Sequence, residues 1–426
     1  MTARSSIVDH SASRRISWIL IGLANLGLLV LLARSPAHSI YDETWFIGTV
    51  DIAKQDGVFT RNFLLDYPGT PGPMYTVLLT GLQHFIPFSY PALRLINVFF
   101  LAADAALIWI LLRVAPRAAK DDDAMPAFVA AFFTVLPTAA TSGGMTLTEM
   151  PSIFFALLFL LGVLLALEQE SNVVTAALLA LLSGLAVAIA IMGRQNFLLL
   201  VFCLPLLIRV RDGIPNFKDT LTLGFAAAVA LALVGPIFLL WGGFIPPKLA
   251  ANGAGLTPWH GVLSLGYAGL ITALFVPGIY CGLRPRAFIG IAVAAVAATA
   301  LFGMPSVPAH SVMSRFASAG TLAVMGYGFA FLYGVAAMAF LAAISKYLWQ
   351  NRADRITLYC GCAALIGFLS NAKVTVQFSS RYVFVFLPFL VLALAPKVRA
   401  NWHLPVRIAL GAALGLLSLS SYYAMG

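Results

Sequence analysis

Two adjacent carboxylates, Asp42 and Glu43, stand in a polar stretch between the first two long apolar runs of the chain. The stretch from Ile40 to Pro73 holds five of the 16 acidic residues, together with glycines and prolines. A carboxylate can take a proton from a nucleophile or bind a metal ion. Irregular polar backbone cannot satisfy its hydrogen bonds in lipid, so this stretch must lie outside a bilayer. We interpret it as an outer loop, at about residues 34–73, with Asp42 and Glu43 as candidate catalytic residues. Apolar residues alternate with charged ones within the loop, and this amphipathic pattern predicts short helices that lie in the membrane interface.

Other ionisable residues follow at the ends of later apolar runs. We predict that five of them bind substrate: Glu149 in TLTEMPS, Arg194 in GRQNF, Lys248 after two prolines, His260 in TPWHG and Arg381 in SSRYVFVFLP. Cations in such places can hold a phosphate group. Two separate carboxylates, Asp42 and Glu149, could also share one hard divalent cation, and we leave that metal site open. The alternatives are structural: Glu149 could favour a helix start, and the arginines could reach for the membrane interface.

The composition of the chain is that of a membrane protein. Of its 426 residues 61% are hydrophobic and only 10% are charged, whereas soluble domains carry about 25% charge. The mean hydropathy is +0.93. The net charge of +10 could suggest a nucleic-acid partner, but the basic residues gather in short loops, where they act as topology signals. We expect an all-α polytopic membrane protein with no nucleic-acid partner.

The apolar runs predict about 11–13 transmembrane helices in a single transmembrane domain, residues 1–426. The run Phe197–Ile208 is the weakest of them, and the run from Met74 fits a short interfacial helix better than a span. More Lys and Arg fall on the inner side if the amino terminus is cytoplasmic, which makes the acidic loop extracytoplasmic. Asp104 is the one acidic residue within a predicted span. We expect an integral membrane protein of a bacterial inner membrane.

Several of these segments, in this order, resemble a family of membrane enzymes. Tyr41-Asp42-Glu43 after the first span, PGTPGPMY from Pro68 and PALRLINVFF from Pro91 are similar to the start of GT-C superfamily glycosyltransferases. That superfamily includes protein O-mannosyltransferases, lipid A aminoarabinose transferases and dolichyl-linked glucosyltransferases. TLTEMPSIFF, GRQNF and SSRYVFVFLP also resemble parts of its layout. The sequence departs from the family at Thr70. Some members have a Lys before adjacent prolines at this place, and that Lys lies near the phosphate, whereas here Thr70 precedes Pro71.

The resemblance implies a function and a set of roles. A sugar would pass from a polyprenyl-phosphate donor to an acceptor hydroxyl on a glycan, lipid or protein, at the extracytoplasmic face. Asp42 matches the acidic residue that is the general base or a metal ligand, and Glu43 is its neighbour. Glu149 matches a carboxylate of the second outer loop. Arg194 and Arg381 are the candidates to bind the phosphate of the sugar donor. A positioned cation stabilises the negative charge that grows on this phosphate as it leaves.

Two other classes of protein remain as alternatives. A secondary transporter would show repeats, broken helices and ionisable residues near the membrane midplane, whereas here the charges gather at one face. A lipid-linked-saccharide polymerase or ligase would share the polyprenyl substrate, but we would expect its functional residues in a large later loop. The sequence names neither the sugar nor the acceptor.

Overall fold

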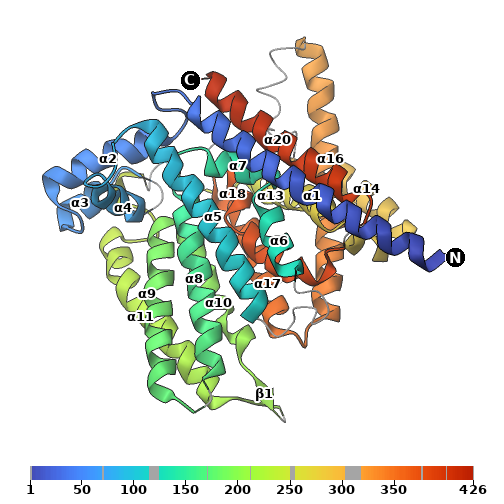
Figure 1. Cartoon of the computed structure of the whole chain (residues 1–426). Coiled ribbons are helices and arrows are strands. Elements are labelled where there is room, and N and C mark those ends of the chain that lie inside the picture. The colour runs from blue at the N-terminus through green and yellow to red at the C-terminus, as the bar shows by residue number, and fades with distance from the viewer. Residues whose placement is uncertain are drawn as a thin grey trace. The chain divides into compact units, whose positions relative to one another are not determined.

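The computed structural model describes most of the chain, in nine stretches: residues 2–69, 72–114, 124–169, 171–211, 213–249, 255–302, 318–375, 378–399 and 401–425. Helices make up almost all of these stretches (Figure 1). The two strands described, β1 (Val210–Arg211) and β2 (Ile214–Pro215), form one antiparallel hairpin. The predicted all-α class is confirmed.

Eight helices of the described chain are long and apolar enough to cross a membrane. They are α1 (Thr2–Ala33), α5 (Tyr90–Val114), α8 (Glu149–Glu168), α9 (Val173–Gly193), α11 (Phe217–Trp241), α16 (Ala319–Gln350), α17 (Arg355–Ser370) and α20 (Leu404–Met425). Their backbone hydrogen bonds are made within each helix, as a bilayer requires. The chain is an integral membrane protein.

The predicted count of 11–13 spans is higher than the structure supports. Helices α6 (Met125–Phe133) and α7 (Pro137–Gly143) replace one predicted span and are bent by 62° at their break, so the described chain offers at most nine spans. The weak run Phe197–Ile208 became α10 (Leu198–Cys203) between two 3-10 turns, η1 (Gln195–Phe197) and η2 (Leu204–Leu207). Prolines divide these runs, because proline lacks a backbone donor and clashes within a helix.

The remaining predicted spans also have helical counterparts, all in the second half of the chain. They are α13 (Pro258–Phe275) with η3 (Pro277–Gly282), α14 (Pro285–Phe302), and the run α18 (Arg381–Phe384), α19 (Leu387–Leu394) and η5 (Ala395–Lys397). None of them is among the helices that are long and apolar enough to cross a membrane by length and composition. A further 3-10 turn, η4 (Asn371–Lys373), follows α17.

The chain forms two compact units. Unit 1 contains residues 1–251 and 400–426, and unit 2 contains residues 252–399. Unit 1 therefore includes the first outer loop and helices α1 to α11, together with the last helix, α20. In unit 2, helix α13 packs against α16 and α17. A single domain was predicted, and that prediction remains untested.

The first outer loop folds into short helices, as its amphipathic pattern predicted. They are α2 (Glu43–Asp56), α3 (Arg61–Asp66) and, after the proline-rich turn, α4 (Met74–Leu82). Helix α2 packs against α4, and α4 packs against α9. In Figure 1 these three helices lie at one end of α8, α9 and α11, and the β1–β2 hairpin lies near the other end.

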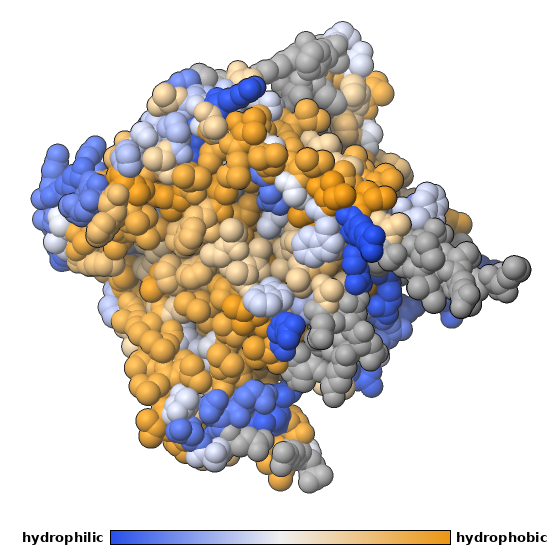
Figure 2. Space-filling view, viewed as in Figure 1, coloured by the Kyte–Doolittle hydropathy of each residue, from blue (hydrophilic) through white to orange (hydrophobic). Residues whose placement is uncertain are grey.

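Small residues bring the long helices of unit 1 together. A Cβ on Gly184 of α9 would collide with the backbone of Ala226 in α11, so only glycine permits this approach. The face of these helices seen in Figure 2 is apolar, and hydrophilic patches lie over α2–α3 and near the hairpin. The polar loops thus mark the two ends of an apolar helical layer.

Candidate functional site

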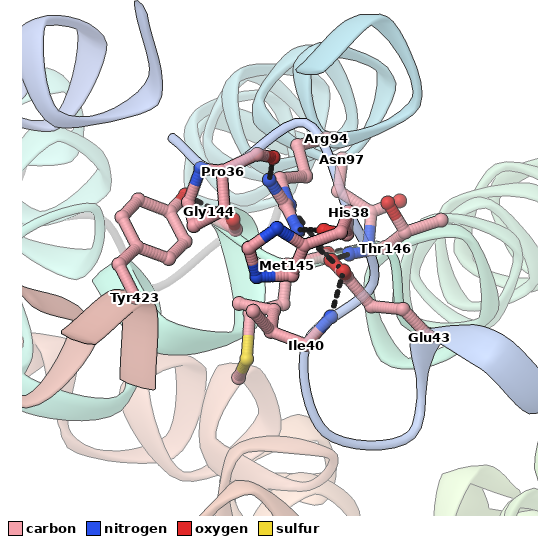
Figure 3. A network of polar contacts seen from close by, with 10 residues as sticks. All are labelled: Pro36, His38, Ile40, Glu43, Arg94, Asn97, Gly144, Met145, Thr146 and Tyr423. Carbon is pink, nitrogen blue, oxygen red and sulfur yellow. Dashed lines mark hydrogen bonds and ion pairs between the residues drawn. The ribbon is translucent and has the colours of Figure 1, made fainter. Parts of the chain in front are cut away.

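The most deeply buried ion pair of the described chain joins the first outer loop to helix α5. Both Glu43 and Arg94 are fully buried. Arg94 donates from Nε to Oε1 of Glu43 at 2.9 Å and from Nη2 to Oε2 at 2.6 Å, which is a bidentate pair (Figure 3). Two-point contacts of this kind fix orientation as well as charge. The pair therefore locks the start of α2 onto α5.

The same two side chains also bind backbone on both sides. Arg94 donates to the carbonyl oxygens of Pro36 and His38, at 2.5 and 2.9 Å. Glu43 accepts from the backbone N–H of Ile40 at 2.9 Å and of Thr146 at 2.8 Å. The first outer loop is thereby tied to a second segment that is 103 residues away in the sequence.

The second segment is the irregular stretch of residues 144–148 between α7 and α8. Its residues are all buried, which is unusual for backbone outside a helix. Asn97 of α5 donates to the carbonyl oxygens of Met145 and Leu147, at 2.6 and 2.8 Å, and Tyr423 of α20 donates to that of Gly144 at 2.6 Å. Side chains thus replace the partners that a helix would have provided, as Figure 3 shows.

A second buried ion pair follows directly after this stretch. Glu149 is the first residue of α8 and is fully buried, and Arg194, at the carboxyl end of α9, donates to its Oε1. Gly193, just before the arginine, packs so closely on Ser152 and Met74 that a side chain there would clash. The cation is therefore held where α4, α8 and α9 meet. Glu149 also suits the positive end of the α8 dipole.

Tyr75 of α4 lies within electrostatic reach of both carboxylates. Its side chain is fully buried, and its hydroxyl donates to Oδ1 of Asn97 at 3.1 Å. Burial raises the pKa of Tyr75 well above its ordinary value, and the negative charges of Glu43 and Glu149 raise it further. The phenol is therefore neutral and a hydrogen-bond donor at ordinary pH. Glu43, Glu149 and Tyr75 belong to one polar cluster.

Asp42 stands at the edge of this cluster, one residue before the buried Glu43. It occupies the N-cap position of α2 and is half-buried, but its side chain does not cap the helix. The preceding Tyr41 has a φ of +53°, a left-handed conformation that a bulky residue rarely adopts. Strain of this kind is often retained at functional sites. The turn sends the two neighbouring carboxylates into different surroundings, with Glu43 inward.

Two predicted site residues belong to unit 2. His260 is buried at the start of α13, where its Nδ1 lies 2.5 Å from the carbonyl oxygen of Val374 and its ring packs on Phe378. Arg381 begins α18 and is buried, with its guanidinium over the ring of Tyr382 at 5.4 Å. Their predicted substrate contacts remain predictions.

Lys248 lies in unit 1 but on its surface. Its ammonium is 3.0 Å from a carboxylate oxygen of Asp66, and both side chains are more than half exposed. Exposed pairs of this kind contribute little to stability. Substrate binding by Lys248 stays a prediction.

The donor atoms of a metal site are sparse in the part of the chain that the structure describes. No group of three or more His, Cys, Asp and Glu side chains lies together there. One oxygen of Glu149 is already engaged by Arg194. Magnesium can use one or two carboxylates plus the phosphates of its substrate, so the predicted ion at Asp42 and Glu149 stays a prediction.

Helix α5 carries the residues that our sequence reasoning underrated. Arg94 and Asn97 stand in PALRLINVFF, a stretch to which the sequence alone assigned no site residue, and both hold the two segments in place. Their spacing of three residues puts them on one helix face. Polar residues on one face of an apolar helix are costly in lipid, and this could have indicated their importance.

Comparison with protein-family models and with curated proteins finds no match for this chain. Two similar solved structures are AglB, an oligosaccharyltransferase of Archaeoglobus fulgidus in complex with an inhibitory peptide and a dolichol-phosphate, and ArnT of Cupriavidus metallidurans in the apo state. The alignment with AglB has 13% identity and a TM-score of 0.43, covers 96% of this chain and spans only 55% of AglB. For ArnT the values are 14% identity, a TM-score of 0.46, and 95% and 76% of the two chains.

Both TM-scores are below 0.5, so neither the superfamily nor the function of this chain follows from these similarities, and the likeness to GT-C glycosyltransferases stays a prediction. Identities this low assign no role to any residue of this chain.

Proposed function

We propose that this protein transfers a sugar from a polyprenyl-phosphate donor to an acceptor hydroxyl at the extracytoplasmic face of its membrane. The observation that supports this most is the buried connection from Glu43 to Thr146, followed three residues later by the pair of Glu149 and Arg194. It gathers carboxylates and a cation from separate segments at one end of the helices of unit 1. A donor with a lipid tail and a phosphate would present its reactive carbon at such a membrane boundary.

The proposed chemistry assigns one role to each group. The acceptor oxygen forms a bond to C1 of the sugar while the bond from C1 to the phosphate oxygen breaks. Asp42 takes the acceptor's proton, a contribution of about 10²–10⁴-fold in rate. Arg194 stabilises the charge that grows on the leaving polyprenyl phosphate, worth about 3–4 kcal/mol for one well-placed donor. Glu43 does not face the substrate: its oxygens already accept four hydrogen bonds, so it positions Asp42.

Asp42→Asn tests this proposal most directly. Purified protein in detergent would be assayed with glucosyl-, mannosyl- and galactosyl-phosphoundecaprenol and alkyl glycoside acceptors. We expect a loss of at least 100-fold in transfer rate, because an amide cannot accept the proton. Asp51→Asn is the matched control, since Asp51 lies on α2, the helix that Asp42 precedes, is exposed and pairs with Lys54 at 3.5 Å. Equal activity in the two variants would contradict the role of Asp42.

A secondary transporter is the second candidate, and two observations favour it. The bend of 62° between α6 and α7 resembles the broken helices of transporters, and Asp104 is fully buried within span α5. Both oxygens of Asp104 have no hydrogen-bond partner among the described residues. If transport is the function, proteoliposomes with the wild-type protein should take up a solute, and Asp104→Asn should abolish that uptake. The protein should then transfer no sugar from any polyprenyl-phosphate donor. Sugar transfer that survives Asp104→Asn would favour the enzyme.

A further inference from the structure

Residues 138–148, which include most of α7 and the irregular stretch before α8, carry a set of buried hydroxyl groups that the proposed mechanism does not use. Their oxygens have no hydrogen-bond partner among the described residues, and they belong to Thr138, Ser142, Thr146 and Thr148. All four side chains are at most 4% exposed. A buried polar group without a partner is destabilising, so four within eleven residues call for an explanation.

Side chains hold four backbone groups of residues 144–147, so the hydroxyl positions are not the result of a loose loop. Asn97, Tyr423 and Glu43 hold the peptide groups of residues 144–147 from three different helices. Gly144 allows this tight enclosure, because a Cβ there would collide with Leu419 of α20. The chain thus fixes the backbone rigidly and leaves the hydroxyls of Thr146 and Thr148 to another partner.

The position of these hydroxyls indicates the chemistry of that partner. Thr148 directly precedes Glu149, whose carboxylate binds Arg194, the proposed phosphate ligand. A group transferred at this site would lie beside the segment. Neutral hydroxyls both donate and accept, and they match the hydroxyls of a sugar ring better than a phosphate or an apolar chain.

We propose that Thr146 and Thr148, in the irregular stretch before α8, determine which sugar is transferred by binding hydroxyl groups of the sugar ring. This inference rests on the proposed function. The hydroxyls are enclosed in this structure, so a sugar reaches them only when the side chains that cover them move.

The test uses Thr146→Val and Thr148→Val, which keep the shape of the side chain and remove only the hydroxyl. Transfer is measured with the undecaprenyl-phosphate-linked hexose that the wild-type protein uses and with its 2-, 3-, 4- and 6-deoxy forms. A second arm uses octyl glycoside acceptors and their deoxy forms, so that donor and acceptor sugars are told apart. Thr141→Val is the matched control, since its hydroxyl is already bonded to the carbonyl oxygen of Thr138.

We expect each variant to lower kcat/KM for the parent sugar about tenfold and to leave kcat/KM unchanged for the one deoxy form that lacks the hydroxyl it reads. Without substrate the variants should melt no lower than the wild type, because a methyl replaces an unpartnered hydroxyl. The thermal shift that the donor produces should shrink. A merely structural hydroxyl would give the opposite pattern, with a lower melting temperature and unchanged selectivity.

Three outcomes would overturn the inference. If the wild type transfers sugar and both variants keep its selectivity, the hydroxyls hold only water and the proposed function stands. If Thr141→Val changes selectivity as much as the others, the effect is one of packing. If the wild type neither transfers any of the sugars nor is stabilised by any donor, the proposed function fails and the inference fails with it.

Discussion

Helix α8 has ion pairs near both of its ends, and the two ends use them differently. At the carboxyl end, Arg209 forms a bidentate pair with Asp219 of α11 and donates to the carbonyl oxygen of Leu167 at 3.0 Å. Lys218 donates to the carbonyl oxygen of Gln169. These cations meet the unsatisfied carbonyls that every helix end leaves, and they suit its negative dipole. Capping alone explains this end.

The amino end of α8 contains far more than capping requires. Glu149 alone would suit the helix dipole, yet the chain also buries Glu43 with Arg94, encloses residues 144–148 without regular structure and leaves four hydroxyls unpartnered within the described chain. Buried charges and unpartnered polar groups reduce stability. A protein retains such costs where they serve a function, and this difference is why we place the site here and not at the hairpin end.

The largest expected effect is a difference in protein stability between variants at the two ends of α8. Glu43→Ala leaves Arg94 buried without its carboxylate and should lower the free energy of unfolding by about 3–5 kcal/mol. Asp219→Ala should cost less, about 1.5–3 kcal/mol, because Arg209 is 21% exposed and keeps its bond to Leu167. Denaturant or thermal unfolding in detergent measures both. If the hairpin-end variant were the less stable of the two, the contrast drawn here would be wrong.

The next largest effect should be a difference in the rate of sugar transfer between variants at the two ends of α8. Glu149→Gln weakens the hold on Arg194 and should lower the rate of sugar transfer by about 10²–10³-fold, as the loss of one positioned donor does. Asp219→Asn disturbs the ion pair at the opposite end of α8, away from the proposed site, and should stay within about twofold of the wild type. Both rates come from the donor assay described above. A comparable loss in both variants would mean that the pairs act only through the fold.

A smaller effect should distinguish the two ends at single hydrogen bonds. Tyr75→Phe removes the bond to Asn97 and should cost about 1 kcal/mol of stability, together with a several-fold loss of transfer. Asn216→Ala removes the side chain that caps α11 by accepting from Asp219 N–H, and it should also cost about 1 kcal/mol. Its transfer rate should not change. Unfolding curves and initial rates, taken on the same preparations, check the pair.

The smallest effect concerns the exposed lysines of the outer loops. Lys248→Ala should change stability by less than about 1 kcal/mol, because its pair with Asp66 is open to solvent. Lys54→Ala is the matched variant, since Lys54 forms a similar exposed pair with Asp51. If Lys248 contacts the donor phosphate as the sequence predicts, its variant alone should raise KM for the donor, with a steeper dependence on salt. An unchanged KM would remove Lys248 from the site.

The sequence determined the membrane character and the location of the important loop. Runs of apolar residues of sufficient length predicted the helices, since the bilayer sets a simple rule of length and polarity. The acidic stretch after the first run predicted an outer loop with short helices, and α2, α3 and α4 are those helices. The sequence did not predict which residues bind one another, because nothing near Glu43 in the sequence indicates Arg94 or Thr146 as its partners.

Only the tertiary structure decided which charges are functional candidates and which are structural. It gave Glu43 four hydrogen bonds in the interior, left Lys248 on the surface and divided one apolar run into α6 and α7 before Pro137. The physical reason is that hydropathy is a local property that each residue carries with it. A hydrogen bond between residues 43 and 146 depends on how α2, α5 and α8 pack, which is set by the side chains of the whole unit.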